Sequence, residues 1–593
     1  MKFNFLPLKN IKPKGWIRKQ LLAQANGLNG NLDKVWKDVR DSKWIGGDGE
    51  GWERFPYFLD GYMPLAYLLS DDDKIERANR YADALISSQR ENGCFLPKKD
   101  DSQNADIWSQ FLILKVLSQY GEITGDERAE KAVYDGLKYL SERTREKTPD
   151  NWACSRWYEC IIPALWIYGK RKEDWIIRFA RRLKTYGLNY GEALKLWDKV
   201  DEKWNYETHV VNVAMALKSD ALFSEITGEK MDGLAGDMLE MLDKYHGTAY
   251  GHFNGDECLS GNEPIRGSEL CSVVEAMYSY EWLMAITGEK KWGDRLERLA
   301  YNGLPATVST DMWTHQYDQQ VNQIACTPFK VKPFRTNNNE ANLFGLEPHY
   351  GCCTSNFGQG FPKLCASAFM EKEGRLVVLS PLPMEVTVGE IRVECKSEYP
   401  FRSSFSLVAS DEIEVLVRIP FSAKPSCSVP FKEENGYMAL TLNKGESVRI
   451  TFPFEPTLVD RPQGRKCVCY GPLLFALPVA SKSVMKEYER NGVERKFPYC
   501  DYEFLPVGEW RYAFASDKFK VVECDYDLPF DREKPAIKLE GEFAPVEWDY
   551  QEGMDLVASV VAGKKRRGKN EKLLMNPYGA TYLRITEMAK VDE

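Results

Sequence analysis

The tetrapeptide Ile226-Thr227-Gly228-Glu229 recurs as Ile286-Thr287-Gly288-Glu289, and residues 123–126 have the similar sequence Ile-Thr-Gly-Asp. In each copy an aliphatic and aromatic segment precedes the glycine, and a charged amphipathic segment follows it. A glycine after the last apolar turn supplies the left-handed C-cap of one helix, and the acidic residue suits the N-terminus of the next. Each copy therefore predicts the turn of a helical hairpin.

Similar turns at residues 69–72 and 168–170 extend the pattern, so that consecutive turns lie 44 to 60 residues apart. About six such hairpins fit before residue 370, which favours either an open solenoid or a closed ring of helix pairs. The aromatic connections at 51–55, 107–108, 157–159 and 204–209 favour the closed ring. Aromatic faces with nearby carboxylates, amides and histidines suit a sugar in a central pocket.

From about residue 371 the apolar period shortens to two, as in Ile413, Val415 and Val417, which is typical of half-buried strands. Residues 438–442 and 448–452 predict a hairpin. We therefore expect a multidomain α+β protein with a helical barrel over 1–370, a β-sandwich over 371–484 and a second, smaller β-rich unit over 485–593. Residues 485–491 are expected to form a polar break between the two β units.

Composition narrows the class of protein. The chain has 593 residues, 43% of them hydrophobic and 28% charged, with a net charge of −9, which gives no electrostatic reason to expect a nucleic-acid partner. It has no apolar run of signal-peptide or membrane-spanning length, so we expect a cytoplasmic protein without a membrane partner. The 15 scattered cysteines suit reduced thiols better than a disulfide framework.

Two neighbouring thiols, Cys352 and Cys353, stand in a polar turn, and Glu269 and Cys271 precede them at a predicted helix start. Three thiolates and one carboxylate can complete a four-ligand Zn²⁺ shell. A helix N-terminus also favours the thiolate form of Cys271. A vicinal disulfide and ordinary packing remain the alternatives for the cysteine pair.

A candidate proton donor lies upstream, where Asp256 and Glu257 follow a glycine and two of the five histidines are nearby. Two further histidines in aromatic or polar surroundings, His209 and His315, are predicted to bind hydroxyl groups of a substrate. For all of these residues the alternative is a structural role in a polar loop or at a helix end.

Taken in order, the motifs at 255–257, 267–271, 352–356, 470–477 and 577–579 resemble the bacterial β-L-arabinofuranosidases of glycoside hydrolase family 127. The resemblance spans most of the chain and implies an (α/α)6 barrel followed by β-sandwich domains. It implies zinc held by Glu269, Cys271, Cys352 and Cys353. It also implies hydrolysis with retention, in which Cys352 is the nucleophile and Glu257 the acid and then the base.

The implied activity is removal of a terminal pentofuranose, β-L-arabinofuranose, from an oligosaccharide or glycoconjugate. Glu257 then needs a raised pKa to carry the first proton. Only 12 positions separate Glu257 from Glu269, fewer than is usual in the family, so Asp256 remains a rival for the acid/base role. Whether Cys352 leaves zinc before attack stays open.

Two other functions remain open. One is a polysaccharide lyase or unsaturated-uronide hydrolase that uses the same barrel with tyrosine, histidine or aspartate chemistry and no catalytic thiol. The other is a non-catalytic carbohydrate-binding scaffold with structural zinc. A homodimer is compatible with all three.

Overall fold

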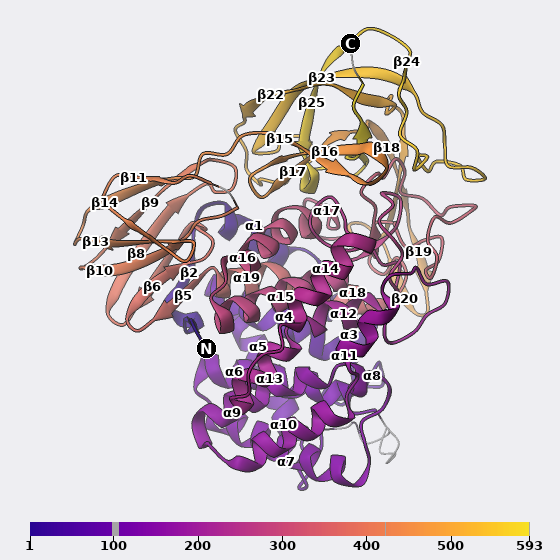
Figure 1. Ribbon diagram of the computed structural model, residues 1–593. Coiled ribbons are helices and arrows are strands. Elements are labelled where there is room, and N and C mark those ends of the chain that lie inside the picture. The colour runs from indigo at the N-terminus through magenta and orange to yellow at the C-terminus, as the bar shows by residue number, and fades with distance from the viewer. Residues whose placement is uncertain (96, 98–105, 422, 592–593) are drawn as a thin grey trace.

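A computed structural model describes residues 1–95, 97, 106–421 and 423–591, and its helices occupy the lower half of the molecule in Figure 1. Six inner helices form a closed ring, since each contacts the next and the last contacts the first. They are α4 (Arg54–Leu69), α6 (Trp108–Thr124), α9 (Ile161–Arg171), α13 (Ser219–Thr227), α15 (Leu270–Thr287) and α19 (Gly360–Ser367). The predicted ring of helix pairs is confirmed.

Burial separates the inner helices from the outer ones. In α4 nearly every side chain is buried, whereas α5 buries only Ala78, Ala82 and Leu85 and turns its charged face outward. The outer helices are α1 (Gly15–Asn26), α5 (Asp72–Ser88), α7 (Glu127–Glu146), α10 (Asp174–Tyr186), α14 (Leu234–His246) and α16 (Lys290–Arg298). Shorter helices are α2 (Leu28–Val35), α3 (Lys37–Arg40), α8 (Asn151–Ser155), α11 (Tyr190–Ala193), α12 (Val210–Ala216), α17 (Leu304–Ala306) and α18 (Gly351–Asn356). Among the described helices, none combines the length and apolar character needed to span a membrane.

The repeated tetrapeptides end helices as predicted. Gly125, Gly228 and Gly288 are left-handed C-caps with φ between 70° and 73°. The threonine before each glycine accepts a 3.2 Å hydrogen bond from the backbone N–H of the acidic residue that follows the glycine. The turn predicted at residue 169 falls later, because α9 continues to Arg171 and Lys172 adopts the left-handed conformation.

Two six-stranded sheets form a unit beside the barrel, at the left of Figure 1. One has the order β1-β5-β6-β10-β13-β12 and the other β11-β14-β9-β8-β7-β2. The first two strands, β1 (Asn4–Phe5) and β2 (Ile11–Pro13), come from the N-terminus, so this segment belongs to the sheets rather than to the barrel. The others are β5 (Phe369–Lys372), β6 (Arg375–Val378), β7 (Met384–Val388), β8 (Ile391–Ser397), β9 (Ser404–Ala409), β10 (Ile413–Arg418), β11 (Ser426–Cys427), β12 (Lys432–Glu434), β13 (Tyr437–Leu442) and β14 (Ser447–Thr451).

The hairpin predicted from residues 438–452 is wrong, although both of its strands exist. Strand β13 pairs with β10 in one sheet, whereas β14 pairs with β9 in the other. The loop between them therefore crosses from sheet to sheet. Alternating apolar residues identify each strand but do not specify its partner.

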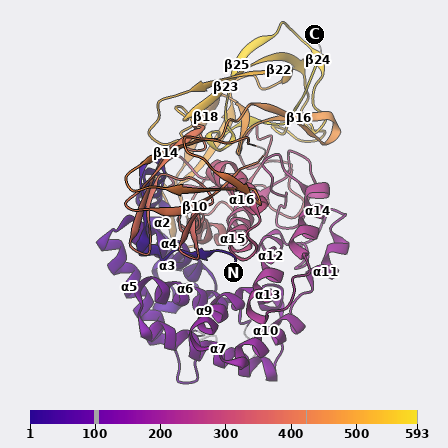
Figure 2. The same cartoon turned by 60° about the vertical axis from the view of Figure 1, so that its left-hand side comes forward.

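A third, nine-stranded sheet lies at the top of Figures 1 and 2. It comprises β15 (Thr457–Arg461), β16 (Arg465–Tyr470), β17 (Leu473–Pro478), β22 (Tyr512–Glu523), β23 (Ile537–Glu547), β24 (Lys565–Arg566), β25 (Glu571–Pro577), β26 (Arg584–Ile585) and β27 (Met588–Ala589). Strand β17 lies before residue 484 and pairs with β25, which lies after it. We therefore propose a domain boundary near residue 456 in place of the predicted boundary after residue 484.

The predicted polar break at 485–491 contains strands. β18 (Ser481–Lys486) pairs with β21 (Asp501–Pro506), and β19 (Tyr488–Arg490) pairs with β20 (Val493–Arg495). Bridges from Phe504 to Cys326 and from Tyr502 to Phe344 join this excursion to the loops above the barrel. It therefore supports the segments that carry the site described next.

Candidate active site

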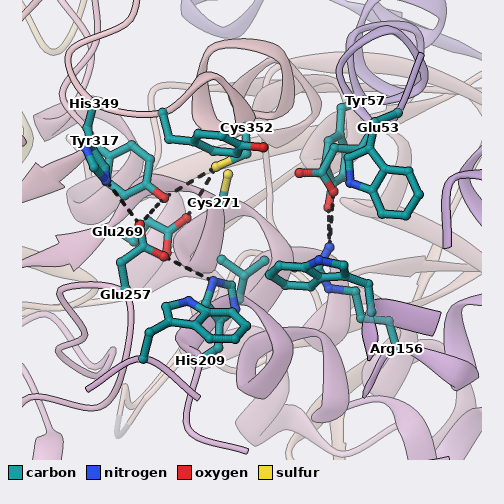
Figure 3. A pocket seen from close by; sticks show the side chains of 15 residues that line it. Glu53, Tyr57, Arg156, His209, Glu257, Glu269, Cys271, Tyr317, His349 and Cys352 are labelled. Carbon is teal, nitrogen blue, oxygen red and sulfur yellow. Dashed lines mark hydrogen bonds and ion pairs between the residues drawn. The ribbon is translucent and has the colours of Figure 1, made fainter. Parts of the chain in front are cut away.

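A cavity of about 240 Å³ opens where the inner helices begin (Figure 3). Drug-sized ligands usually occupy roughly 300–1,000 Å³, so this space suits a ligand the size of one sugar ring. Its lining is aromatic and charged: Trp52, Glu53, Tyr57, Trp152, Arg156, Trp204, His209, Val211, Glu257, Glu269, Cys271, Tyr317, His349, Tyr350 and Cys352. Two of the four predicted aromatic segments, 51–55 and 204–209, line this cavity, whereas 107–108 and 157–159 do not.

Four predicted metal ligands, Glu269, Cys271, Cys352 and Cys353, meet at the floor of the cavity. Each offers one ligand atom, and these four atoms lie within 4.8 Å of one another. Glu269 Oε1 is 3.7 Å from Cys352 Sγ and 3.8 Å from Cys353 Sγ. Residues 83 positions apart in the sequence thus form a group that could hold a metal ion.

Two helix starts bring these side chains together. Glu269 is the N-cap of α15, and Cys271 lies in the first turn. Cys352 and Cys353 lie in the first turn of α18. A two-residue ladder of β3 (Ser268–Glu269) with β4 (Asp318–Gln319) holds the start of α15 in register.

The donor set fits a divalent cation. Burial and the nearby Glu257 and Cys352 charges raise the pKa of Glu269 well above its usual range. Its Oε2 atom is buried without a hydrogen-bond partner among the described residues. A buried carboxylate beside three thiols is costly unless a cation compensates it, and soft thiolates select Zn²⁺ or similar metals.

The two neighbouring cysteines differ in access. Cys352 is partly exposed and lines the cavity, whereas Cys353 is fully buried and does not line it. Burial raises the pKa of Cys353 and of Cys271, and the neighbouring thiols add to the effect for Cys353. For Cys352, burial is outweighed by hydrogen bonds from Cys271 and Cys353, so its pKa is lowered. Cys352 is therefore the thiol of the pair that is accessible from the cavity.

Glu257 faces Cys352 across the hydroxyl of Tyr317. That hydroxyl donates a 2.7 Å hydrogen bond to Glu257 Oε1 and lies 3.5 Å from Cys352 Sγ. His209 Nε2 lies 3.3 Å from Oε2 of Glu257, and His349 Nε2 lies 3.5 Å from its Oε1 (Figure 3). Glu257 also has φ of 130°, a conformation that non-glycine residues rarely adopt.

The raised pKa expected for Glu257 is not found. Burial alone would raise it, but hydrogen bonds from His209, His349 and Tyr317 act in the opposite direction and lower the pKa to about 2. The carboxyl group is therefore ionised at neutral pH in this structure. A sequence does not reveal that two imidazoles and a phenol converge on one carboxylate.

Asp256, the predicted rival of Glu257, points away from the cavity. Its Oδ1 accepts a hydrogen bond from the Gly267 backbone N–H, and its Oδ2 accepts one from the Arg335 backbone N–H. The side chain is fully buried and does not line the cavity. Asp256 thus ties together two loops beside the site, and Glu257 is the better acid/base candidate.

The two histidines predicted to bind substrate have different environments. His209 is the N-cap of α12, accepts a hydrogen bond from the Asn212 backbone N–H and lines the cavity. The prediction for His315 is wrong, because this residue is fully buried outside the cavity. Its Nδ1 lies 2.8 Å from the Gln316 carbonyl, and its Nε2 lies 3.0 Å from Thr354 Oγ1.

Sequence reasoning missed several residues of the cavity. Tyr317 stands two residues after His315, and its neighbour Asp318 pairs with Glu269 in the ladder. On the opposite wall, Arg156 Nη1 lies 3.4 Å from Glu53 Oε2 and 3.3 Å from the Tyr57 hydroxyl. The guanidinium of Arg156 lies 4.5 Å from the ring centroids of Trp108 and Trp152. The many aromatic residues next to these positions in the sequence are the signal that could have identified this wall.

A closed helical ring with a thiol and carboxylate group at an aromatic cavity defines a barrel protein with a candidate metal-containing active site. No known family matches the sequence, and no curated protein matches it either. Solved structures do match. A GH127 β-arabinofuranosidase has a TM-score of 0.65 at 14% identity, over 100% of this chain and 99% of that one.

Two further solved structures match over almost their full lengths. A GH127 β-L-arabinofuranosidase from Geobacillus stearothermophilus T6 has a TM-score of 0.68 at 14% identity, over 98% of this chain and 100% of that one. A protein described as a glycoside hydrolase has a TM-score of 0.69 at 12% identity, over 100% and 98%. The chain has the fold of these proteins, which confirms the predicted helical barrel followed by β domains.

Proposed function

We propose that this protein is a retaining, exo-acting glycoside hydrolase that releases a terminal pentofuranose, β-L-arabinofuranose, from an oligosaccharide or glycoconjugate. One observation carries the proposal: Cys352, the accessible member of the Glu269, Cys271, Cys352 and Cys353 group, faces Glu257 across Tyr317. The fold shared with a protein described as a β-arabinofuranosidase and another described as a β-L-arabinofuranosidase supports the choice of sugar.

The size and lining of the cavity support action on a chain end. A space of about 240 Å³ suits one sugar ring, as expected for a terminal residue. Trp152 and Trp204 offer aromatic faces for the C–H surface of the ring. His209, Glu53 and Arg156 offer polar atoms for its hydroxyl groups, so His209 remains a proposed substrate-binding residue.

We assign the metal as zinc, held by Glu269, Cys271, Cys352 and Cys353. Three thiolates and a carboxylate match its preference for sulfur and for four ligands. When bound, zinc would keep the thiols deprotonated and fix the orientation of their sulfur atoms. The rest of the chemistry belongs to the side chains of the chain.

In the first step, Cys352 Sγ attacks the anomeric carbon. A C–S bond forms, the bond from that carbon to the leaving oxygen breaks with its electron pair, and a proton passes to the leaving oxygen from the side of Glu257. In the second step Glu257 removes a proton from water, the water oxygen attacks the same carbon, and the C–S bond breaks to restore the thiolate. Two inversions give net retention.

The ionised state of Glu257 limits how the first proton is stored. Since its pKa lies at about 2, the carboxyl group depends on its hydrogen-bonded surroundings for the proton that the first step requires. His209 Nε2 and His349 Nε2 lie 3.3 Å and 3.5 Å from its oxygens, and the Tyr317 hydroxyl donates to it. We propose that Glu257 passes this proton to the leaving oxygen.

The redox state of the cysteines also bears on the cellular compartment in which the protein works. None of the 15 cysteines in the described structure forms a disulfide, and the catalytic role proposed for Cys352 requires a reduced thiol. We therefore retain a cytoplasmic location as a proposal.

The test is hydrolysis of 4-nitrophenyl furanosides and pyranosides by the purified protein, with and without a chelator, beside its Cys352→Ala variant. We expect the protein to hydrolyse the β-L-arabinofuranoside. Both the chelator and the Cys352→Ala substitution should abolish this hydrolysis. Turnover that survives in Cys352→Ala would favour thiol-independent chemistry. Saccharide binding without turnover of any glycoside would favour a binding scaffold.

A further inference from the structure

A second cavity, of about 500 Å³, lies farther along the same inner helices that carry the site. On α15, Cys271 lines the first cavity and Glu281 the second, ten residues or about 15 Å farther along the helix. On α4, Tyr57 lines the first and Asp60 the second. The N-terminal segment at 4–8 closes one side of this second cavity. It is thus a separate space at the other end of the ring.

Charged side chains that are almost fully buried form its inner wall. Lys363 Nζ lies 2.6 Å and Lys115 Nζ 3.0 Å from the same oxygen of Asp60, Oδ2. The exposed fractions of Asp60, Lys115 and Lys363 are 1%, 2% and 5%. Groups of this kind are retained in an interior at a cost in stability, which makes them candidates for a function.

Several polar atoms of this wall lack a partner among the described residues. They are Asp60 Oδ1, Glu281 Oε1 and Gln119 Oε1 on carboxyl or amide groups, and two donors, Trp282 Nε1 and Lys115 Nζ, the latter in ion pairs only. Burial raises the pKa of Glu281 to about 8, so its carboxyl group is largely neutral at pH 7 and can also donate. Donors and acceptors without partners call for a ligand whose groups do both, as hydroxyl groups do.

Aromatic rings also line the cavity. Trp282 packs edge-on against Phe5 with ring centroids 5.3 Å apart, and Trp166 lies on the inner helix α9. Both tryptophans line the cavity and are only partly buried. Aromatic rings together with carboxyl groups and an amide suit a ligand with both apolar C–H surfaces and hydroxyl groups.

Charge decides among ligands with O–H or N–H groups. A charged ligand of either sign would meet like charge in this buried space, a cation at Lys115 and Lys363 and an anion at Asp60, while the opposite charges already pair with one another. A neutral polyhydroxylated molecule avoids both penalties. We propose that the second cavity is a binding site for a neutral mono- or disaccharide, distinct from the active site and independent of the function proposed there.

Calorimetric titration of the full chain tests this, with L-arabinose, D-galactose, cellobiose and lactose as probes and D-glucuronate and putrescine as charged counter-probes. We expect at least one neutral probe to bind with a Kd near or below about 1 mM. Trp282→Ala and Trp166→Ala should each weaken that binding by about tenfold or more. Trp204→Ala, the matched change in the first cavity, should leave it within about twofold, while glycoside hydrolysis by Trp282→Ala stays unchanged.

The proposal is overturned if no neutral probe binds, if glucuronate or putrescine binds more tightly, or if binding is lost in Trp204→Ala and kept in the other two variants. Should Trp282→Ala fail to fold, Trp166→Ala and Glu281→Gln decide, because Trp166 is only partly buried and Gln preserves the shape of Glu281. Failure of these tests leaves hydrolysis untouched, so it is distinguishable from failure of the function proposed for the first cavity.

Discussion

The hydroxyl of Tyr317 donates a 2.7 Å hydrogen bond to Glu257 Oε1 while it lies 3.5 Å from Cys352 Sγ. It is the one described contact that joins the proposed acid/base to the proposed nucleophile. The position of Tyr317 is fixed by its backbone, since its carbonyl accepts a 2.9 Å hydrogen bond from the Leu270 N–H at the start of α15. The same helix start presents Glu269 and Cys271, so one backbone junction sets the geometry of both chemical groups.

Replacement of Tyr317 by Phe should lower kcat/KM by about 10- to 100-fold, because a hydrogen bond to a charged group contributes roughly 1.5–3 kcal/mol. The metal content should not change, since Tyr317 is not among the proposed ligands. Steady-state kinetics with 4-nitrophenyl β-L-arabinofuranoside and elemental analysis measure the two quantities.

Tyr67→Phe is the matched control, because it removes a 2.6 Å hydrogen bond from a tyrosine to Asn79 at the end of α4. It should leave kcat/KM within about twofold. Equal losses in the two variants would contradict the role given to Tyr317.

Glu257→Gln and Asp256→Asn should separate chemistry from structure. Loss of a general acid/base costs about 10²- to 10⁴-fold, so Glu257→Gln should lose that much activity. Asp256→Asn keeps the acid/base but replaces an acceptor of two backbone N–H groups, so it should lower the free energy of unfolding by about 1–3 kcal/mol and keep most activity. Kinetics and urea denaturation distinguish the two, and a reversed pattern would make Asp256 the acid/base.

Much of this arrangement was predictable, and the rest has a physical reason. Local patterns pointed to the hairpin turns at Gly228 and Gly288 and to Glu269 and Cys352 as members of the candidate metal group, because capping and metal preference depend on residue type. The partners of β13 and β14, the burial of His315 and the low pKa of Glu257 depend on contacts between distant segments. Such contacts leave little trace in a local pattern.

Glu53 should make stability depend on pH. Burial raises its pKa from 4.5 to about 7, and the Arg156 charge opposes this only in part. Between pH 4.5 and 7 the folded chain therefore holds a proton that the unfolded chain has lost, so stability falls as the pH rises through this window. The contribution of Glu53 should decrease by about 3 kcal/mol across it.

Glu53→Gln cannot lose this proton, so its stability relative to the wild type should improve from pH 4.5 to pH 8. Chemical denaturation of both proteins at the two pH values measures the change, and the raised pKa of Glu50 largely cancels in the comparison because burial is its main cause. A difference between the two proteins that does not vary with pH would show that Glu53 ionises normally.

Loss of the metal should cost both activity and stability. The purified protein should contain about one zinc ion per chain. The Glu269→Gln variant should retain little zinc, because it lacks one of the four proposed ligands. Elemental analysis and thermal unfolding measure these effects.

Glu275→Gln provides the control on the same helix. Glu275 is buried and accepts hydrogen bonds from Asn356 and Gln359, outside the metal group. It should keep the metal even if it lowers stability. Metal loss in both variants would indicate general unfolding rather than removal of a ligand.

Covalent trapping on Cys352 tests the central claim most directly. The protein would be treated with a furanose-mimicking epoxide, digested, and analysed by mass spectrometry beside Cys352→Ser and Cys353→Ser. We predict a single adduct on Cys352 of the wild type, formed together with loss of activity, and no adduct in Cys352→Ser. An adduct on Glu257 or another residue, or full hydrolytic activity in Cys352→Ser, would contradict the account.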